Sequence, residues 1–129
     1  MKHSKACVTG GAGFIGSKLV RRLLSLGIQV RVIDNLSVGR RENVPEGAEL
    51  LTGDILDASA MDKAAEGCDI LFHLAARVAI RSSFEFVVED TTVNVAGTAA
   101  ALRAAQRAGT VRRVVSTSSM AVYADAPTP

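Results

Sequence analysis

A glycine-rich turn near the N-terminus constrains this chain more than any other feature. Residues 9–16 read Thr-Gly-Gly-Ala-Gly-Phe-Ile-Gly and hold two overlapping patterns, G-x-G-x-x-G from Gly11 and G-x-x-G-x-x-G from Gly10. A short apolar run, Lys5–Val8, precedes the turn, and residues 14–26 follow with apolar side chains at helical spacing. Glycines between a strand and a helix bring the backbone close to a pyrophosphate, and the helix N-terminus offers that anion unpaired N–H groups. The turn therefore predicts a dinucleotide-binding strand–turn–helix unit.

A carboxylate follows the second predicted strand. Asp34 comes directly after the apolar run Val30–Ile33. A carboxylate at this point accepts hydrogen bonds from both ribose hydroxyls of an adenosine and repels a 2′-phosphate, so we expect NAD rather than NADP. The alternative is an aspartate that only begins a turn. NADP also stays open, because a guanidinium of one of three nearby arginines would bind a 2′-phosphate: Arg31, Arg40 and Arg41.

Strand and helix patterns alternate along the rest of the chain. The further strands are predicted at residues 48–51, 70–74 and 113–116, and the helices at residues 59–65, begun by Asp57 or Ser59, and 86–108. Residues 36–47 are polar and predict a loop with at most one helical turn. The strands are continuous apolar runs, which is typical of parallel strands buried on both faces. We predict an α/β fold with a doubly wound Rossmann-type parallel sheet, five strands in the order 3-2-1-4-5, and one dinucleotide-binding domain over residues 1–129.

Composition and charge exclude several other classes of function. The 15 Lys and Arg residues against 13 Asp and Glu give a net charge of +2, too balanced for electrostatic binding of nucleic acid. No apolar run approaches the ~20 residues of a membrane span, and no secretory signal is visible, so we expect a cytoplasmic protein. Cys7 and Cys68 are far apart and predict reduced core thiols. His3 and His73 are isolated from each other, so no metal site is expected.

Seven short segments carry a resemblance to a known family. They occur in order at residues 9–16, 34–41, 53–57, 73–76, 94–98, 116–119 and 122–123. Together they resemble the extended short-chain dehydrogenase/reductase superfamily, and within it the NAD-dependent sugar-nucleotide epimerases and dehydratases, with the UDP-glucose 4-epimerases as the closest type. The resemblance implies NAD as the cofactor and the following residues as its contacts: Gly10, Gly13, Phe14, Ile15, Gly16, Asp34, Asn35, Ser37, Gly39, Asp54, Ile55, Leu74, Ala75, Ala76, Arg77, Asn94 and Thr117.

The resemblance gives roles to several of these residues, and each role has a plainer alternative. Asp54 and Ile55 would flank the adenine, or Asp54 would only begin the next helix. Residues 74–76 would lie against the middle of the cofactor. Arg77 would lie near a ribose or be a solvated surface arginine. Asn94 would bond backbone across the sheet and shape the cofactor site, or be an exposed helical residue. His73 is expected to be structural.

The catalytic serine of the family matches Ser119, with Ser118 as the neighbouring alternative. Its hydroxyl would contact the sugar hydroxyl that is oxidised. Tyr123 belongs to a Val-Tyr-Gly element in which Ala124 replaces the glycine, and it is not the family's catalytic tyrosine. That tyrosine belongs to a Tyr-x-x-x-Lys pair, which these 129 residues do not contain.

The missing pair leaves three functions open. We expect the N-terminal half of an enzyme, cut off before the remaining strands and the substrate domain, that takes a hydride from a nucleotide-sugar carbon onto NAD and returns it. Alternatively the chain alone is a dinucleotide-binding module, or half of a split enzyme, that needs a complementing chain. A third alternative is a non-catalytic relative that senses NAD or binds a protein. Relatives often dimerise through two helices, one of them matching residues 86–108, so a homodimer is expected.

Overall fold

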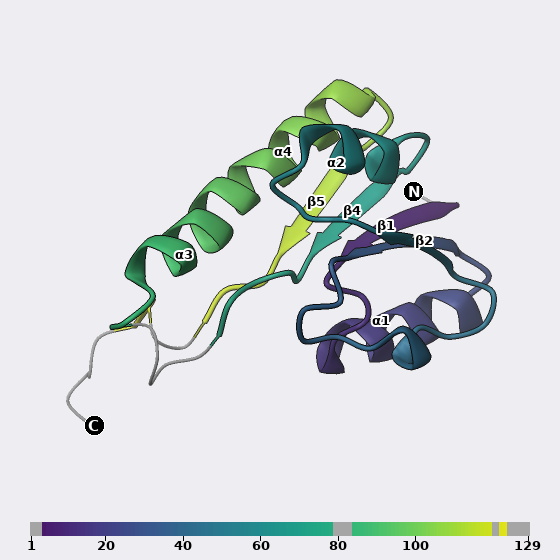
Figure 1. The fold of residues 1–129 in the computed structure, drawn as a ribbon. Coiled ribbons are helices and arrows are strands. Elements are labelled where there is room, and N and C mark those ends of the chain that lie inside the picture. The colour runs from purple at the N-terminus through teal and green to yellow at the C-terminus, as the bar shows by residue number, and fades with distance from the viewer. Residues whose placement is uncertain (1–3, 79–83, 120–121, 124–129) are drawn as a thin grey trace, which may run out of the picture.

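The computed structural model describes residues 4–78, 84–119 and 122–123, which contain a parallel sheet with helices on both of its faces (Figure 1). Its strands lie side by side in the order β3-β2-β1-β4-β5, and every neighbouring pair is parallel. The predicted number of strands and their order are therefore confirmed. The strands are β1 (Lys5–Thr9), β2 (Gln29–Asp34), β3 (Glu49–Thr52), β4 (Ile70–His73) and β5 (Arg113–Ser116).

The helices begin and end close to their predicted bounds. They are α1 (Phe14–Ser25), the short 3₁₀ turn η1 (Arg41–Asn43), α2 (Ala58–Ala65), α3 (Val87–Thr91) and α4 (Gly97–Ala108). Asp57 rather than Ser59 caps α2, because its carboxylate accepts hydrogen bonds from the Ser59 and Ala60 N–H groups at 2.9 and 3.2 Å. The helix predicted over residues 86–108 differs in one respect: a π-helical turn, η2 (Thr92–Ala96), joins α3 to α4.

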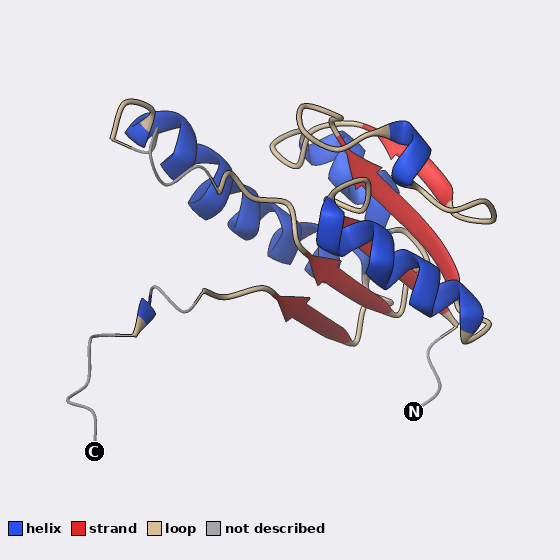
Figure 2. Ribbon diagram, turned by 90° about the horizontal axis from the view of Figure 1, so that it is seen from below, coloured by secondary structure: helices blue, strands red, loops and turns tan. Residues whose placement is uncertain are grey.

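Two apolar layers cover the sheet. α1 lies on one face, while α2 and α4 lie on the other (Figures 1 and 2). Alternate strand residues point to opposite faces, so Val8 and Val32 pack toward α1 while Cys7 and Leu71 pack toward α2 and α4. Small residues bring α4 close to its neighbours: a Cβ atom on Gly97 would collide with the Ile55 side chain. The three central strands β1, β2 and β4 are thus buried on both faces, which explains their continuous apolar runs.

The parallel arrangement gathers the ends of the strands at one edge. The register pairs Thr9 with both Ile33 and His73, Asp34 with Thr52, and His73 with Ser116. The glycine turn, the Asp34 carboxylate, the segment after His73 and the segment after Ser116 therefore all leave the sheet at this carboxyl edge. Within the part of the chain that the structure describes, no helix is long and apolar enough to cross a membrane.

Candidate dinucleotide-binding site

The glycine turn is packed tightly between β2 and β4. Gly10 has φ +70°, and its N–H donates to the Ile33 carbonyl oxygen at 2.9 Å. A Cβ atom on Gly10 would lie 2.8 Å from the Ala75 nitrogen, and one on Gly16 would collide with the Gly10 carbonyl oxygen. Glycine is required at both positions by the backbone itself, because each lets two main-chain segments touch.

Gly13 differs from the other two glycines of the G-x-x-G-x-x-G pattern. Its φ of −78° is open to any residue. A Cβ atom there would meet a single neighbour within 4 Å, the Gly10 carbonyl oxygen at 3.3 Å. The fold therefore accepts a small side chain at Gly13 with little adjustment, and what a side chain would remove is access to the backbone at the start of α1.

The N-terminus of α1 is open to an anion. Gly13 is its N-cap residue and supplies no side-chain hydrogen bond, and the first turn contains no acidic residue. The side chains of Phe14 and Ile15 are exposed. Free N–H groups and the positive end of the helix dipole together favour a phosphate at this point.

Asp34 is held beside this turn by two backbone hydrogen bonds. One carboxylate oxygen accepts from the Ala12 N–H at 3.0 Å, and the other accepts from the Leu36 N–H at 2.9 Å. The side chain is buried, and Ala12 lies inside the glycine turn. Each oxygen has a second lone pair, so a fixed carboxylate can still accept from ribose hydroxyls.

The loop after Asp34 packs onto the glycine turn at Ala12. The Arg40 N–H and the Asn43 side-chain amide donate to the Ala12 carbonyl oxygen at 3.2 and 2.9 Å. A Cβ atom on Gly39 would lie 2.8 Å from the Ala12 carbonyl carbon. Gly39 is therefore explained by this close approach of two loops.

The side chains of Asn35, Ser37 and Asp54 are joined by hydrogen bonds. The Asn35 side-chain NH₂ donates to the Asp54 carboxylate at 3.0 Å, and the Ser37 hydroxyl donates to the Asn35 side-chain oxygen Oδ1 at 2.7 Å. Asp54 also accepts from the Leu56 N–H at 2.9 Å. Ile55 is buried against α4 rather than exposed at the carboxyl edge. The predicted contact between Ile55 and adenine stays a prediction.

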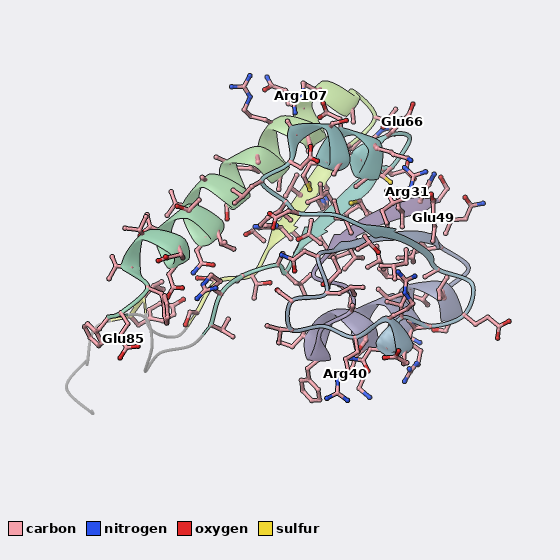
Figure 3. All side chains as sticks on the ribbon, in the orientation of Figure 1. Arg31, Arg40, Glu49, Glu66, Glu85 and Arg107 are labelled. Atoms are coloured by element: carbon pink, nitrogen blue, oxygen red, sulfur yellow. The ribbon has the colours of Figure 1, made fainter. Side chains whose placement is uncertain are left out.

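Arg31 does not lie where a 2′-phosphate would bind. Its guanidinium donates to the Glu49 carboxylate at 2.7 Å and to the Lys63 and Glu66 carbonyl oxygens at 2.6 and 3.0 Å. Figure 3 shows it beside Glu49 and the end of α2, well away from Arg40. The part of the NADP alternative that rested on Arg31 was wrong, because a strand sequence does not show where a long side chain turns.

The segment after β4 is tied to the glycine turn and to the π-helical turn. The Leu74 and Ala75 N–H groups donate to the Thr9 hydroxyl at 3.2 and 3.1 Å. The Asn94 amide pairs with the backbone of Arg77, accepting from its N–H at 2.8 Å and donating to its carbonyl oxygen at 3.0 Å. Asn94 thus bonds backbone, as expected, although its partner is the loop after β4.

Arg77 is engaged with the helix that follows. Its guanidinium donates to the Asp90 carboxylate at 2.6 Å and lies 5.7 Å from the centre of the Phe86 ring. It is therefore neither a purely solvated arginine nor directed freely toward a ribose.

Comparison with known proteins places this site in a family. The profile described as "NAD dependent epimerase/dehydratase family" matches residues 6–129. The chain belongs to the NAD-dependent epimerase/dehydratase family. It is 45% identical over 121 residues to a UDP-glucose 4-epimerase of Mycolicibacterium smegmatis, covering 89% of this chain and 38% of the relative. It is also 41% identical over 122 residues to a 3 beta-hydroxysteroid dehydrogenase/Delta 5-->4-isomerase of Mycobacterium tuberculosis, covering 92% of this chain and 32% of that one.

Solved structures agree with the family assignment. A crystal structure of the Brucella ovis UDP-glucose 4-epimerase in complex with NAD matches with a TM-score of 0.87 and 33% identity, over 98% of this chain and 38% of that chain. NAD is therefore the cofactor of the family to which the chain belongs. The chain spans well under half the length of these relatives.

The residues of this family member fit an NAD molecule at the glycine turn. Gly13 leaves a cradle at the start of α1 that a larger side chain would fill. The Asp34 carboxylate stands next to it and is fixed by the Ala12 N–H. An anion-binding helix end beside an acceptor for ribose hydroxyls is the combination that a dinucleotide requires.

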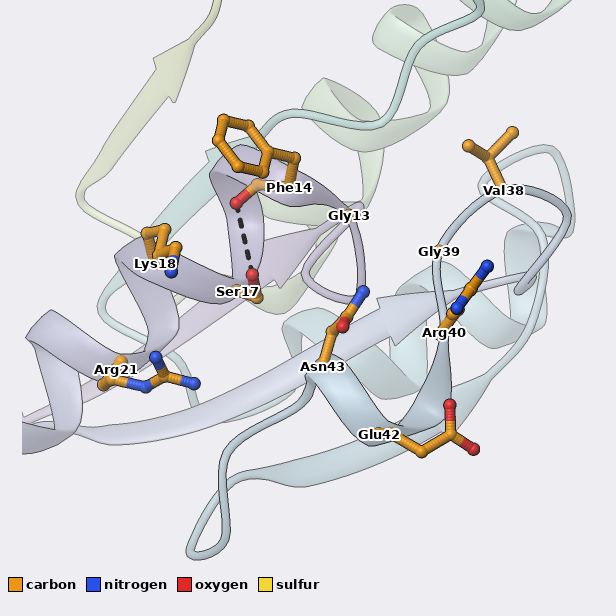
Figure 4. Close-up of a pocket in the computed structure, with 10 residues that line it drawn as sticks. All are labelled: Gly13, Phe14, Ser17, Lys18, Arg21, Val38, Gly39, Arg40, Glu42 and Asn43. Carbon is orange, nitrogen blue, oxygen red and sulfur yellow. Dashed lines mark hydrogen bonds between the residues drawn. The ribbon is translucent and has the colours of Figure 1, made fainter.

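A shallow pocket adjoins this turn on the outer side of α1 (Figure 4). It lies between α1 and the loop after β2, and the Ser17 hydroxyl inside it donates to the Phe14 carbonyl oxygen at 3.2 Å. Six of its residues were not predicted from the sequence as part of a site: Ser17, Lys18, Arg21, Val38, Glu42 and Asn43. A signal was present for two of them, since Lys18 and Arg21 are three residues apart and share the polar face of the helix.

The predicted catalytic segment follows β5 at the same carboxyl edge. The Thr117 hydroxyl and N–H both donate to the His73 carbonyl oxygen at 3.2 Å, so Thr117 fastens β5 to β4. Ser118, Ser119 and Tyr123 are exposed. The catalytic role of Ser119 stays a prediction, and Ala124 lies outside the described residues.

No metal site was predicted, and the described residues contain no group of three or more His, Cys, Asp or Glu side chains that would hold a metal ion. His3 lies outside that range. Burial raises the pKa of the Cys7 thiol to about 12, and it raises the pKa of Cys68 as well. Both cysteines are buried and free, as expected of core thiols.

Proposed function

We propose that the chain binds NAD across the carboxyl edge of its sheet and forms the cofactor-binding part of a nucleotide-sugar epimerase. The observation that carries the proposal is Gly13, a glycine that the fold does not require, at the open N-terminus of a helix and close to the Asp34 carboxylate. The names and NAD complexes of the relatives support the same function.

In this proposal the residues of the chain bind and orient. The free N–H groups at the start of α1 bind the pyrophosphate, and Asp34 accepts hydrogen bonds from the adenosine ribose. Leu74, Ala75 and Ala76 lie along the middle of the dinucleotide. Ser119 directs its hydroxyl to the sugar hydroxyl that loses a proton. The bound nicotinamide supplies a hydride acceptor for the sugar carbon and afterwards a hydride donor.

The substrate class belongs to the whole protein and is part of the proposal. UDP-sugar epimerases are prominent among the relatives, which favours a nucleotide sugar. A steroid dehydrogenase/isomerase at 41% identity shows that this portion of the family serves more than one substrate class. A chain that only binds NAD is the alternative, and the lack of a Tyr-x-x-x-Lys pair in these 129 residues favours it for the isolated chain.

The test of NAD binding is Gly13→Val. Its side chain would occupy the cradle at the start of α1, so we expect NAD affinity to fall at least about tenfold, or about 1.4 kcal/mol. Thermal unfolding should change little, since the φ of Gly13 suits a branched residue. Isothermal titration calorimetry and circular dichroism measure the two effects.

Gly27→Ala is the matched control. Gly27 has φ +75° and nothing within 4 Å of a built Cβ atom, so the substitution strains the backbone far from the turn. It should cost about 1 kcal/mol of stability and leave NAD affinity intact. Unchanged NAD affinity in Gly13→Val would place the pyrophosphate elsewhere and overturn the proposal.

A further inference from the structure

A directional chain of hydrogen bonds runs through His73. The Thr9 hydroxyl oxygen accepts from two backbone N–H groups, those of Leu74 and Ala75, and the Leu74 N–H is shared with the Thr9 carbonyl oxygen at 3.2 Å. With both lone pairs engaged, its own hydrogen is left for the Nδ1 atom of His73 at 2.8 Å. His73 Nδ1 is therefore an acceptor, and the ring proton belongs on Nε2.

The chain continues from His73 into the π-helical turn. Nε2 lies 3.1 Å from the Thr98 hydroxyl oxygen and donates to it, and the Thr98 hydroxyl donates to the Asn94 carbonyl oxygen at 2.6 Å. The side chain of Asn94 then holds Arg77 through both backbone groups of that residue. This series of hydrogen bonds begins at the N–H groups of Leu74 and Ala75 and ends at the backbone of Arg77. It therefore holds both ends of the segment 74–77.

The surroundings of His73 favour the neutral ring. The side chain is buried between β1, β5 and α4. A narrow space lined by uncharged residues adjoins the His73 side chain. The groups that surround His73 there are Thr9 from β1, Val114 and Ser116 from β5, and Thr98, Ala101 and Leu102 from α4. Burial lowers the pKa of His73, and none of these neighbours carries a charge that would oppose the effect.

We infer that His73 is a positioning residue: its neutral form, with the proton on Nε2, holds residues 74–77 against the glycine turn in the arrangement that receives the cofactor. The inference rests on the proposed function, because residues 74–76 are the predicted contacts of NAD. The contact it maintains is close, since Gly10 touches Ala75 without room for a Cβ atom.

Protonation of the ring would break the chain at its first link. A protonated Nδ1 becomes a donor, and the Thr9 hydroxyl oxygen could accept from it only by releasing the Leu74 N–H to the Thr9 carbonyl oxygen, with which that N–H is already shared at 3.2 Å, or by releasing the Ala75 N–H. The folded state thus disfavours protonation of His73. Above the ordinary histidine pKa of about 6.5, His73 causes no pH-dependent loss in the free energy of unfolding. As pH falls below that value the unfolded chain gains a proton that the folded chain lacks, so stability declines. NAD affinity should decline when His73 itself becomes protonated.

Thr98→Val and Thr98→Ser are the matched pair that tests this series of hydrogen bonds through His73, called the relay below. Valine keeps the shape of threonine but leaves His73 Nε2–H without an acceptor, whereas serine keeps the hydroxyl. We expect Thr98→Val to weaken NAD binding about tenfold and to speed hydrogen exchange of the Arg77 amide. Thr98→Ser should restore both. Equal behaviour of the two variants would overturn the inference.

Nuclear magnetic resonance of the ¹⁵N-labelled 129-residue chain tests the tautomer without any cofactor. At neutral pH the Nε2 atom of His73 should carry the proton and Nδ1 should be bare, and the opposite tautomer would overturn the relay. In a His3→Ala background the loss of NAD affinity on acidification should follow the titration of His73. An affinity independent of that titration would also contradict the inference.

The two proposals fail in different ways. If the unmodified chain binds no NAD, the proposed function is wrong, while the His73 tautomer and the Arg77 exchange rate still decide whether the relay exists. If NAD binds and Thr98→Val changes neither affinity nor exchange, the proposed function stands and the positioning role of His73 is wrong.

Discussion

At the scale of single residues, Asp34 joins the fold of the turn to the choice of cofactor. Its two oxygens accept from the Ala12 and Leu36 N–H groups, so the carboxylate sets the shape of the turn while it faces the adenosine side of the predicted site. A negative charge at this position is predicted to repel a 2′-phosphate. The predicted preference for NAD and the geometry of the turn therefore rest on the same side chain.

Asp34→Ser separates these two effects. Removal of the carboxylate should weaken NAD binding and shift the ratio of NAD to NADP affinity toward NADP by about tenfold or more, because the repulsive charge is gone. It should also cost about 1–3 kcal/mol of stability, since the Ala12 and Leu36 N–H groups lose their acceptor. Asp57→Ala is the control: it loses a helix cap worth about 1 kcal/mol and should leave the ratio unchanged. Tighter binding of NADP than NAD by the unmodified chain would contradict the prediction.

The individual glycines show which features of the site the sequence predicts and which only the structure reveals. The pattern in residues 9–16, together with the strand before it, the helix after it and Asp34, predicted the turn and the helix start that the structure contains. The dinucleotide site at this turn stays a prediction. The pattern did not distinguish Gly10 and Gly16, which permit backbone contact, from Gly13, which leaves the helix end open. That distinction depends on which segments lie next to the turn, and a sequence pattern does not contain this information.

At the scale of secondary-structure elements, the π-helical turn η2 is the feature that the sequence did not predict. Apolar spacing over residues 86–108 indicates a helix, and π-helical turns are rare features that occur mostly as single turns within α-helices. Asn94, within this turn, is a residue of low helix propensity. Two hydrogen bonds are made at this turn. The Thr98 hydroxyl donates to the Asn94 backbone carbonyl oxygen, and the Arg77 N–H donates to the Asn94 side-chain oxygen. The second of these contacts joins segments that are distant in the sequence.

Helix α2 depends on an arginine from the sheet. Arg31 donates to carbonyl oxygens at the C-terminal end of α2 and pairs with Glu49 on β3. Arg31→Met keeps the apolar stem but removes these hydrogen bonds, so we expect a loss of about 1–3 kcal/mol in the free energy of unfolding, measured by urea denaturation. The ratio of NAD to NADP affinity should not change, since the guanidinium points away from the site. A shift of that ratio in Arg31→Met would indicate that Arg31 does contribute to cofactor binding.

At the scale of the whole molecule, the strand order was predicted correctly because the local signals agreed with it. Continuous apolar strands, intervening helices and right-handed crossovers leave few arrangements. The same layers leave apolar side chains exposed along α3, η2 and α4: Val88, Val95 and Leu102, here called the apolar stripe, are 74, 65 and 50% exposed. Exposed apolar side chains that lie along one segment are suited to packing against another protein surface.

Self-association through this stripe is the corresponding prediction. Val88→Glu combined with Val95→Glu should lower the association of the 129-residue chain, measured by sedimentation velocity over a range of concentrations, because charges would line the interface. Val38→Glu is the control, since Val38 is 91% exposed on the loop after β2 and off this helix. An unmodified chain that is monomeric at high concentration would contradict the prediction.

Catalysis by the 129-residue chain is expected to be absent. Oxidation of a sugar hydroxyl needs a base within hydrogen-bond reach of its proton. The Thr117 hydroxyl after β5 donates to the His73 carbonyl oxygen. The exposed hydroxyls of Ser118, Ser119 and Tyr123 follow it, and none is a sufficient base without activation. No lysine follows Lys63 in the sequence, so no ammonium group lies three or four residues after Tyr123 to activate its hydroxyl. Loss of an acid/base group alone typically costs about 10²–10⁴-fold in rate. Interconversion of UDP-sugars, followed with NAD at high protein concentration, should therefore stay at background. Turnover by the purified chain that disappears in Ser119→Ala would show that these residues suffice for the reaction.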